Sequence, residues 1–356
     1  MSGCGHTKIE VSFTSVSVTG SRRISMVTVF KNECSTLRGH GASRNKTMHS
    51  VRRGKGVQLL LIHGLGGSWR SWSPVLESLA SQREVIAVDL PGFGQTPPLP
   101  GQASIATLAD AVTDFLRSER LMGIDAVGSS MGARLVLELA RRGGVLGSVV
   151  SLNPGGFWTG WQRHAFYASI WASIRLVRLL QPVMPALNRS AIGRTMLFAQ
   201  FSAYPWRLPP HVTLDEMRSY AASPSFDELL RQLAYGENQQ GAQPGSIEHP
   251  LVIGWGRHDH VCFPSQAKRA VALFPDARLH WFEHCGHFPQ WDVPRETVRL
   301  ILDHTGTSAH LRHPQDGSVR AVHAAMTKES ISCSEKSAIG RSRNKYGNRA
   351  GAAERG

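Results

Sequence analysis

The residues best placed to do chemistry belong to a Gly-x-Ser-x-Gly pentapeptide that runs from Gly128 to Gly132. An apolar run, IDAV, precedes it and an amphipathic segment, GARLVLELARR, continues from it. This context predicts a sharp strand-to-helix turn with Ser130 at its apex. Side chains two positions before and after the serine would collide with neighbouring atoms, so both positions need glycine. We therefore predict Ser130 as a nucleophile and expect Ser129 to make only a local hydrogen bond.

A serine hydroxyl becomes a good nucleophile only when a base takes its proton, and that base needs an orienting carboxylate. Asp259 follows the apolar run PLVIGWG, and His287 follows the next one, RLHWFE. Both therefore lie just beyond strand ends, as Ser130 does, and we predict a triad of these three residues. His284 is a second candidate base, but His287 follows a glycine and fits the loop better. Asp89 precedes the serine in a turn-rich DLPGFG segment and is predicted to stabilise that turn.

A glycine-rich segment, HGLGG at 63–67, ends another apolar run, LLLI. The backbone N–H of Leu65 would point into the site from this loop and, with the N–H of Met131, form an oxyanion hole. Such donors face charge that develops in the transition state, and removing one typically costs ~10²–10³ in rate. His63 and Gly64 are predicted to support the loop.

A metal site is the main rival interpretation of the same loops. It would use His258, Asp259, His260, His284 and Cys285. Adjacent residues on a turn point in different directions, however, and no second pair of ligands at helical spacing is present. We predict no metal and no cofactor.

The elements that must position these side chains follow a regular pattern from residue 57. Strand-length runs rich in Val, Ile and Leu alternate with amphipathic segments, which is typical of a mostly parallel sheet with helices on both faces. Helices are predicted over 70–81, 104–118, 131–142, 264–273 and 294–304. The alternation stops over 155–248, where no strand run occurs. We interpret that segment as a helical cap inserted between strands, over their carboxyl ends.

The predicted cap is rich in aromatic residues. They are Phe157, Trp158, Trp161, Phe166, Tyr167, Trp171, Phe198, Phe201, Tyr204 and Trp206. Most should pack the cap, and some should line an apolar pocket. Two further uses of the cap stay open. Its arginines, Arg163, Arg175, Arg178 and Arg194, could anchor a carboxylate or simply be solvated, and an amphipathic helix over 166–180 could contact membrane lipid.

The chain divides into a core, the cap and two basic ends. The core is predicted over 57–154 and 249–305, with a partly disordered basic extension at 1–56 and a basic disordered tail at 306–356. The stretch IEVSFTSVSV (9–18) within the extension is a possible edge strand. The net charge is +14, but 57–305 holds 21 basic and 20 acidic residues, so nucleic acid is not a predicted partner.

Sequence features also bear on the compartment. No apolar run reaches the roughly 18 residues of a membrane span, and the start does not resemble a secretory signal. The five cysteines are few and irregularly spaced, which favours free thiols in a reducing compartment. These features predict a cytoplasmic protein without a transmembrane segment.

The segments HGLGG, DLPGFG, GSSMGA, WGRHDH and CGHFPQWDVP, in this order, resemble those of the α/β-hydrolase superfamily over 57–305. The last segment is similar to that of serine esterases and of meta-cleavage C–C hydrolases. The resemblance implies the α/β-hydrolase fold. Dehalogenase and epoxide hydrolase relatives have Asp where this chain has Ser130, so both activities are disfavoured. Asn153 stands where some relatives have their acid, which supports Asp259. Ser129 differs from the His or Asn common before the nucleophile.

These features together predict a serine hydrolase that cleaves a carboxylic ester, or a related acyl bond, of an apolar small molecule through an acyl-Ser130 intermediate. The alternative is a C–C bond hydrolase that acts on a meta-cleavage type diketone with the same residues. A cofactor-free haloperoxidase-like enzyme and a non-catalytic binding module are weaker alternatives.

Overall fold

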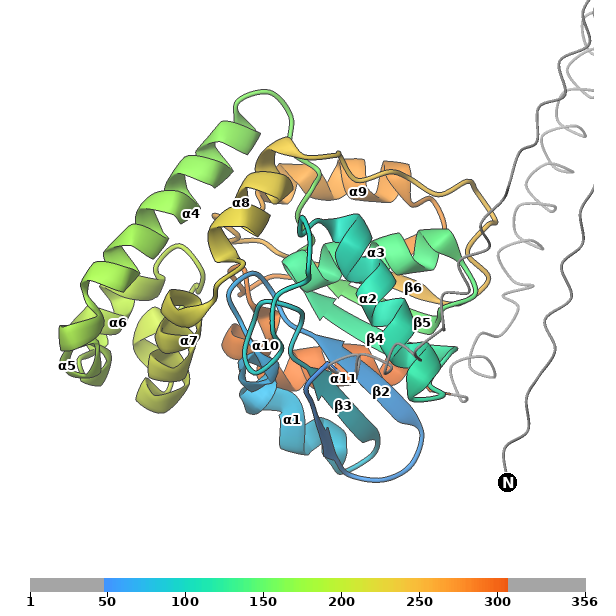
Figure 1. Cartoon of the computed structure of the whole chain (residues 1–356), viewed down its shortest axis with the longest axis horizontal. Coiled ribbons are helices and arrows are strands. Elements are labelled where there is room, and N and C mark those ends of the chain that lie inside the picture. Colours follow the sequence, from blue (N-terminus) through green and yellow to red (C-terminus); the bar gives the residue numbers. More distant parts are fainter. Residues whose placement is uncertain (1–47, 307–356) are drawn as a thin grey trace, which may run out of the picture. The chain divides into compact units, whose positions relative to one another are not determined.

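A seven-stranded sheet organises residues 48–306, which are the residues that the computed structural model describes (Figure 1). The strand order is β1-β3-β2-β4-β5-β6-β7, and every neighbouring pair is parallel except β1 with β3. The strands are β1 Ser50–Arg53, β2 Gln58–Ile62, β3 Glu84–Val88, β4 Ile124–Ser129, β5 Leu146–Leu152, β6 Leu251–Gly256 and β7 Ala277–Phe282. The predicted mostly parallel sheet is confirmed.

The antiparallel edge strand β1 lies inside the segment 1–56 that we interpreted as an extension. Ser50 pairs with Val88 and Arg53 with Val85, so the ordered body starts ahead of the expected core boundary at 57. The stretch 9–18 and the tail after 306 lie outside the described residues.

Both faces of the sheet are buried, and β2 shows why its sequence is uniformly apolar. Leu59, Leu60, Leu61 and Ile62 are all fully buried. Leu60 and Ile62 belong to one hydrophobic cluster, while Leu59 and Leu61 belong to the other. Because successive side chains of a strand point to opposite faces, each face of β2 packs into its own cluster.

Helices cover both clusters. The cluster on one face includes α1 (Ser73–Ala80) and α11 (Pro294–His304). The other includes α2 (Ile105–Ser118), α3 (Met131–Arg142) and α9 (Ala267–Leu273). The helix predicted over 70–81 begins as a 3₁₀ turn, Trp69–Trp72, and α1 starts next to Pro74. Proline suits a first helical turn because its missing N–H would have no helical partner there.

The segment between β5 and β6, for which we keep the name cap, is helical and has no strand. Its helices are α4 Gln162–Leu179, α5 Met184–Arg189, α6 Ala191–Phe198, α7 Pro210–Ala222 and α8 Phe226–Tyr235. Figure 1 shows α4 to α7 gathered on one side of the sheet. No helix within 48–306 is both long enough and apolar enough to cross a membrane.

An ion pair between Arg83 and Asp125 closes the amino-terminal edge of the sheet. The Arg83 guanidinium donates to Asp125 at 2.8 Å, and the two side chains are only 7% and 12% exposed. Asp125 also accepts hydrogen bonds from the backbone N–H of Ser148 (2.8 Å) and of Gly306 (2.5 Å). One carboxylate therefore joins the starts of β4 and β5 to the segment after α11.

We expect Asp125→Ala to lower the free energy of unfolding by about 3–5 kcal/mol, because it leaves the Arg83 guanidinium buried without its partner. Urea denaturation measures this difference. Asp114→Ala, which removes an exposed ion pair with Arg117, is the matched control and should cost at most about 1 kcal/mol. Equal effects of the two substitutions would contradict the structural role of Asp125.

Candidate active site

Ser130 lies at a strained turn between β4 and α3. Its φ of 57° and ψ of −113° are unusual for a residue with a side chain. The turn is held by hydrogen bonds from Ser130 N–H to the Leu152 carbonyl (2.9 Å) and from Arg134 N–H to the Ser130 carbonyl (3.1 Å). Neighbouring strand and helix thus impose a conformation that the serine alone would avoid.

The two glycines of the pentapeptide allow this close approach. A Cβ at Gly128 would lie 2.1 Å from the Gly132 carbonyl oxygen, and a Cβ at Gly132 would lie 2.3 Å from the carbonyl oxygen of Ile62. Both contacts are with backbone atoms, which cannot move aside without displacing β2 or α3. Any side chain at either position would therefore disturb the turn.

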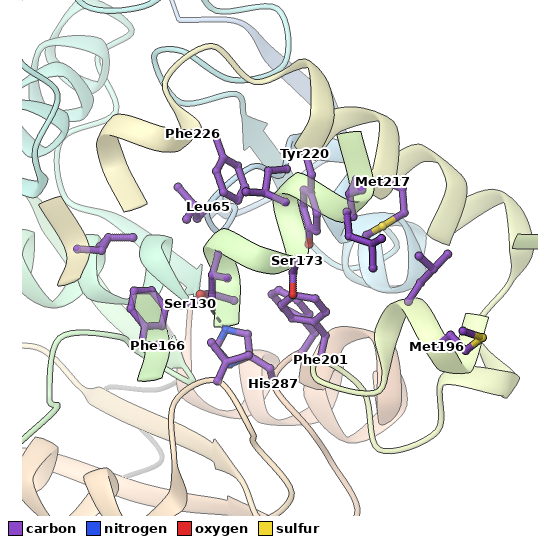
Figure 2. Close-up of a pocket in the computed structure, with 18 residues that line it drawn as sticks. Leu65, Ser130, Phe166, Ser173, Met196, Phe201, Met217, Tyr220, Phe226 and His287 are labelled. Atoms are coloured by element: carbon purple, nitrogen blue, oxygen red, sulfur yellow. Dashed lines mark hydrogen bonds between the residues drawn. The ribbon is translucent and has the colours of Figure 1, made fainter. Parts of the chain in front are cut away.

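The structure brings together the three residues predicted to act on one another. His287 Nε2 lies 2.8 Å from Ser130 Oγ, and His287 Nδ1 lies 2.8 Å from Asp259 Oδ2. Figure 2 shows the contact between Ser130 and His287 as a dashed line. The residues follow β4, β6 and β7, so they meet at the carboxyl ends of parallel strands. His287 and Asp259 are each 1% exposed.

Asp259 is oriented by backbone donors. Its Oδ1 accepts hydrogen bonds from the N–H groups of Val261 (2.8 Å) and Cys262 (2.9 Å), which leaves Oδ2 for His287. A carboxylate can only accept, so it fixes the proton of His287 on Nδ1. Nε2 is then free to accept the hydroxyl proton of Ser130.

Asn153 braces the loops that hold Asp259 and His287. Its Nδ2 donates to the Gly286 carbonyl at 2.8 Å, and its Oδ1 accepts from Gly256 N–H at 2.9 Å. A Cβ at Gly256 would lie 2.1 Å from the Gly286 carbonyl oxygen. Asn153 therefore ties β5 to the ends of β6 and β7.

Asp292 is a supporting residue that the sequence did not reveal. It ends the short helix α10 (Pro289–Asp292) and accepts the N–H groups of Gly286 (2.7 Å) and Ala203 (2.8 Å) as well as the Ser202 hydroxyl. Burial raises the pKa of its carboxyl group. His287 N–H also donates to the Phe201 carbonyl at 2.8 Å. These contacts fasten the histidine loop and Asp292 to a cap segment 86 or more positions earlier, which spacing alone cannot show.

The glycine-rich loop is fixed from the core and from the cap. His63 Nδ1 contacts the Gly64 carbonyl at 2.7 Å, and its Nε2 accepts from Leu90 N–H at 3.0 Å. Burial lowers the pKa of His63, which favours the neutral ring that this pattern requires. On the other side, the hydroxyls of Ser219 and Ser223 donate to the Gly66 carbonyl at 2.8 and 3.2 Å.

The two predicted oxyanion donors are both near the serine. Leu65 lines the same cavity as Ser130. Met131 is the first residue of α3, so its N–H has no acceptor within the helix. Within 48–306, neither N–H donates to another protein group. A Cβ at Gly64 would lie 3.1 Å from the Ser130 Cβ, so the loop also packs directly on the serine.

Asp89 and Ser129 lie outside the group of three. Asp89 accepts from the N–H groups of Trp69 (2.7 Å) and Gln95 (3.0 Å), which fits the predicted turn-stabilising role. Ser129 differs from the expectation of a local hydrogen bond. Its Oγ accepts from Gln290 Nε2 at 3.1 Å, because the buried end of β4 faces α10 rather than its own turn.

The possible ligands of the metal interpretation are separated by the fold. His258, His260 and His284 are exposed. A different group, Asp259, Cys262 and His287, has ligand atoms within 4.8 Å of one another. A metal would need the Cys262 thiolate, but burial and the nearby Asp259 raise the pKa of this thiol well above its usual value. The arrangement suits proton transfer between His287 and Ser130 better.

An apolar cavity opens over Ser130 between the core and the cap (Figure 2). It encloses ≈ 740 Å³, counted out to its solvent-open mouth. Its polar side chains are Ser130, His287, Ser173 and Tyr220, and the others are apolar. Of the ten aromatic residues singled out in the sequence, only Phe166 and Phe201 line the cavity. Tyr220, Phe226 and Phe288 also line it and were not foreseen, because which face of a cap helix turns inward depends on tertiary packing.

None of the four arginines singled out in the cap lines this cavity. Arg194 is buried and donates to backbone carbonyls, including that of Asn188 at 2.7 Å. Arg178 pairs with Asp227 at 2.7 Å. The cavity over Ser130 therefore has no cationic side chain for a carboxylate.

Glu216 of α7 is buried where the cap meets the core. It is 2% exposed, and within the described residues its oxygens have no partner at hydrogen-bonding geometry. Burial raises the pKa of Glu216 to about 7, although the nearby hydroxyls of Ser71 and Tyr220 partly oppose this effect. Its carboxyl group is therefore ionised only at a cost to cap–core packing.

This burial predicts a pH-dependent stability. Folding raises the pKa of Glu216 from 4.5 to about 7, so the protonated carboxyl group favours the folded state. This contribution to stability is complete below about pH 4.5 and is lost as the pH rises through 7. Glu216→Gln should unfold at nearly the wild-type temperature at pH 5 and be more stable by roughly 3 kcal/mol at pH 9. Thermal unfolding across this range measures the effect. Glu77→Gln, on an exposed face of α1, is the control, and a pH-independent difference for Glu216→Gln would refute the assignment.

Comparison with known proteins gives one family. A family model described as "Alpha/beta hydrolase family" matches residues 59–300. The chain is 30% identical over 271 residues to the dihydrolipoyllysine-residue acetyltransferase component of the acetoin cleaving system of Cupriavidus necator, and the match spans 72% of this chain and 66% of that protein. It is 27% identical over 271 residues to 2-hydroxy-6-oxononadienedioate/2-hydroxy-6-oxononatrienedioate hydrolase 2 of Pseudomonas putida, spanning 72% and 90%.

Solved structures agree with the fold. A thermophilic esterase from Thermogutta terrifontis matches with a TM-score of 0.57 at 18% identity, over 72% of this chain and 94% of the esterase. At that identity the likeness concerns the fold alone. Together with the seven-stranded sheet, these matches confirm the fold expected from the sequence.

Proposed function

Because this chain belongs to the alpha/beta hydrolase family, we propose that it is a serine hydrolase that cleaves a carboxylic ester of an apolar small molecule. The observation that carries the proposal is the pair of 2.8 Å contacts that link Asp259, His287 and Ser130 beneath an apolar cavity. Nucleophile, base and orienting acid then have the geometry that acyl transfer requires.

The first half of the reaction forms an acyl-enzyme. His287 Nε2 takes the Ser130 proton as Oγ attacks the ester carbonyl carbon, and the buried Asp259 stabilises the resulting imidazolium. The N–H groups of Leu65 and Met131 hold the oxyanion of the tetrahedral intermediate. When the carbon–oxygen bond breaks, His287 returns its proton to the leaving alkoxide, and an alcohol departs.

The second half releases the acid. A water molecule gives a proton to His287 and attacks the acyl carbonyl, and the same two N–H groups again hold the oxyanion. Collapse of this intermediate breaks the bond to Ser130 Oγ, which takes back the proton from His287. The products are one carboxylic acid and one alcohol, and the enzyme returns to its starting state.

The cavity supports an apolar acyl or aromatic group as the part of the substrate that is bound. The cavity is lined by Leu, Ile, Val, Met and Phe side chains. Burying an apolar substrate group against them is favourable by about 25 cal/mol per Å² of apolar surface removed from water. Its few hydroxyls, on Ser173 and Tyr220, can orient one polar group.

Carbon–carbon bond hydrolysis is the second candidate, favoured by the match to the Pseudomonas putida hydrolase, which spans 90% of that protein. The name of that relative describes a dioate, which carries two carboxylates. No Arg or Lys lines the cavity described here. An ester therefore suits this cavity better than a dicarboxylate diketone does.

The test is covalent labelling with a fluorophosphonate, combined with turnover of nitrophenyl esters of rising acyl length. The wild type should label, and Ser130→Ala should neither label nor retain more than about one part in 10⁴ of kcat/KM. Ser129→Ala removes the adjacent hydroxyl and is the matched control, which should still label. A wild-type protein that neither labels nor cleaves any ester would sink the proposal, and turnover of a ring-fission diketone would then favour the second candidate.

Asp292 gives a further prediction as a positioning residue. Asp292→Asn converts one of the two acceptor oxygens into an NH2 donor, so the side chain can no longer accept from Gly286, Ala203 and Ser202 together. This should shift the histidine loop and lower kcat by roughly 10–100-fold with little change in KM. Steady-state kinetics on one nitrophenyl ester measures the split. Glu296→Gln, on the partly exposed face of α11, is the control. A loss confined to KM or to the unfolding temperature would show that Asp292 is not a positioning residue.

A further inference from the structure

The cap has a charge pattern unlike the rest of the chain. Between residues 155 and 213 there are six arginines and neither Asp nor Glu. The arginines are Arg163, Arg175, Arg178, Arg189, Arg194 and Arg207. The remainder of 57–305 holds fifteen basic and twenty acidic residues, so the six arginines of 155–213 offset an acidic excess of five elsewhere in the body.

The same part of the cap exposes large apolar side chains. We call the following group the cap patch: Trp171 (44% exposed), Leu176 (50%), Leu179 (74%), Val183 (50%), Ile192 (74%), Met196 (79%) and Trp206 (47%). Outside the cap, the described residues expose only Val57 and Met122 to a comparable degree. Scattered exposed apolar residues are ordinary, but a concentration in one subdomain indicates an interaction surface.

Hydrogen bonds join the elements that carry the cap patch. It comes from the second half of α4, the turn after it, α6, and the 3₁₀ turn Pro205–Arg207. Gln200, just after α6, bonds the hydroxyls of Ser169 and Ser173 on α4 at 3.3 Å each. Arg194 of α6 donates to the Trp206 carbonyl at 2.9 Å. These bonds hold the end of α6 against α4, and α6 against the 3₁₀ turn.

Three exposed arginines frame the cap patch. Arg175 lies over the Trp171 ring at 5.4 Å, and Arg207 lies over the Tyr204 ring at 4.8 Å. Arg189 ends α5 and is exposed. Within 48–306 none of the three is joined to an acidic side chain by a salt bridge, whereas Arg178 pairs with Asp227. Their charges therefore stay available to an anionic partner.

The cap patch borders the cavity. Leu176 and Met196 belong to the patch, and both also line the cavity that contains Ser130 and His287. Figure 2 places Met196 well apart from Ser130, with Ser173 and Phe201 between them. An apolar chain held at the patch could thus pass between α4 and α6 to the serine without crossing water.

From these observations we propose that the cap patch docks on the surface of an anionic phospholipid bilayer. Aromatic and aliphatic side chains with arginines among them match the boundary of headgroups and acyl chains, where cations are attracted to the anionic surface. A symmetric contact with a second copy would instead bring together two surfaces that both carry unpaired arginines. If the serine hydrolase function proposed above holds, the docked cap delivers a lipid acyl ester from the bilayer to Ser130.

Docking is tested without turnover, in the full chain carrying Ser130→Ala, by sedimentation with vesicles of phosphatidylcholine and phosphatidylserine. Leu179→Asp combined with Ile192→Asp should weaken binding by at least about tenfold, because two exposed apolar groups lose their burial in lipid. Neither residue lines the cavity. The matched control is Val57→Asp combined with Met122→Asp. Both positions are exposed and lie just before β2 and β4, at the amino-terminal ends of the strands and away from the cap. Both variants keep the basic ends of the chain, so any vesicle binding through those ends contributes equally to the two measurements.

Three outcomes would overturn docking. The first is that the cap variant binds vesicles as tightly as the control variant, and the second is that the protein binds pure phosphatidylcholine more tightly than the mixed vesicles. The third is that the substitutions in the cap variant convert a dimer to a monomer without changing vesicle binding. Lipid delivery is tested separately with Ser130 intact. The cap variant should cleave a short soluble nitrophenyl ester at the wild-type rate and lose at least about tenfold on an ester embedded in vesicles. If the wild type cleaves neither ester, the hydrolase proposal fails while the sedimentation result still decides docking.

Discussion

The strained backbone of Ser130 is the constraint on which the rest of the site depends. A positive φ at a serine persists only when the surroundings over-determine it. Here β4, β5 and α3 do so through the bonds to Leu152 and Arg134 and through glycine contacts with Ile62. A parallel sheet with helices on both faces supplies this rigidity, since its central strands are buried on every side. The position of the hydroxyl is therefore a property of the core and not of a mobile loop.

The other half of the site depends on the cap. His287 N–H donates to the Phe201 carbonyl, and Asp292 accepts from both Gly286 and Ala203. The Gly66 carbonyl is held by Ser219 and Ser223. The cap thus fastens both the histidine loop and the glycine-rich loop on either side of Ser130. Its residues do more than cover the cavity, because they also fix the distance between base and nucleophile. Wholesale movement of the cap would break these bonds, so access is better explained by an opening between its helices.

Sequence reasoning reached the residues whose positions follow from strand ends. Ser130, Asp259 and His287 each come directly after a strand of one parallel sheet, so order along the chain was enough to bring them together. It missed Asp292 and the bond from Gln290 to Ser129, because both depend on how α10 meets the cap and the core. The cavity aromatics Tyr220 and Phe226 were missed for the same reason. No periodic pattern says which side of a cap helix faces inward.

A net charge summed over a whole chain can hide a charged region of its surface. The body from 57 to 305 is close to neutral, and that balance led the sequence analysis away from a charged surface. The two signs are unevenly distributed along the body, because residues 155–213 carry six arginines and no acidic residue, while all twenty acidic residues lie elsewhere in 57–305. Electrostatic attraction acts over about 8–10 Å at physiological salt, so a partner at the cap experiences the local charge and not the sum. Helix α4 lines the cavity with Ile170, Ile174 and Val177 and also carries the exposed Arg175. Recognition of a surface and recognition of a substrate are therefore coupled through α4.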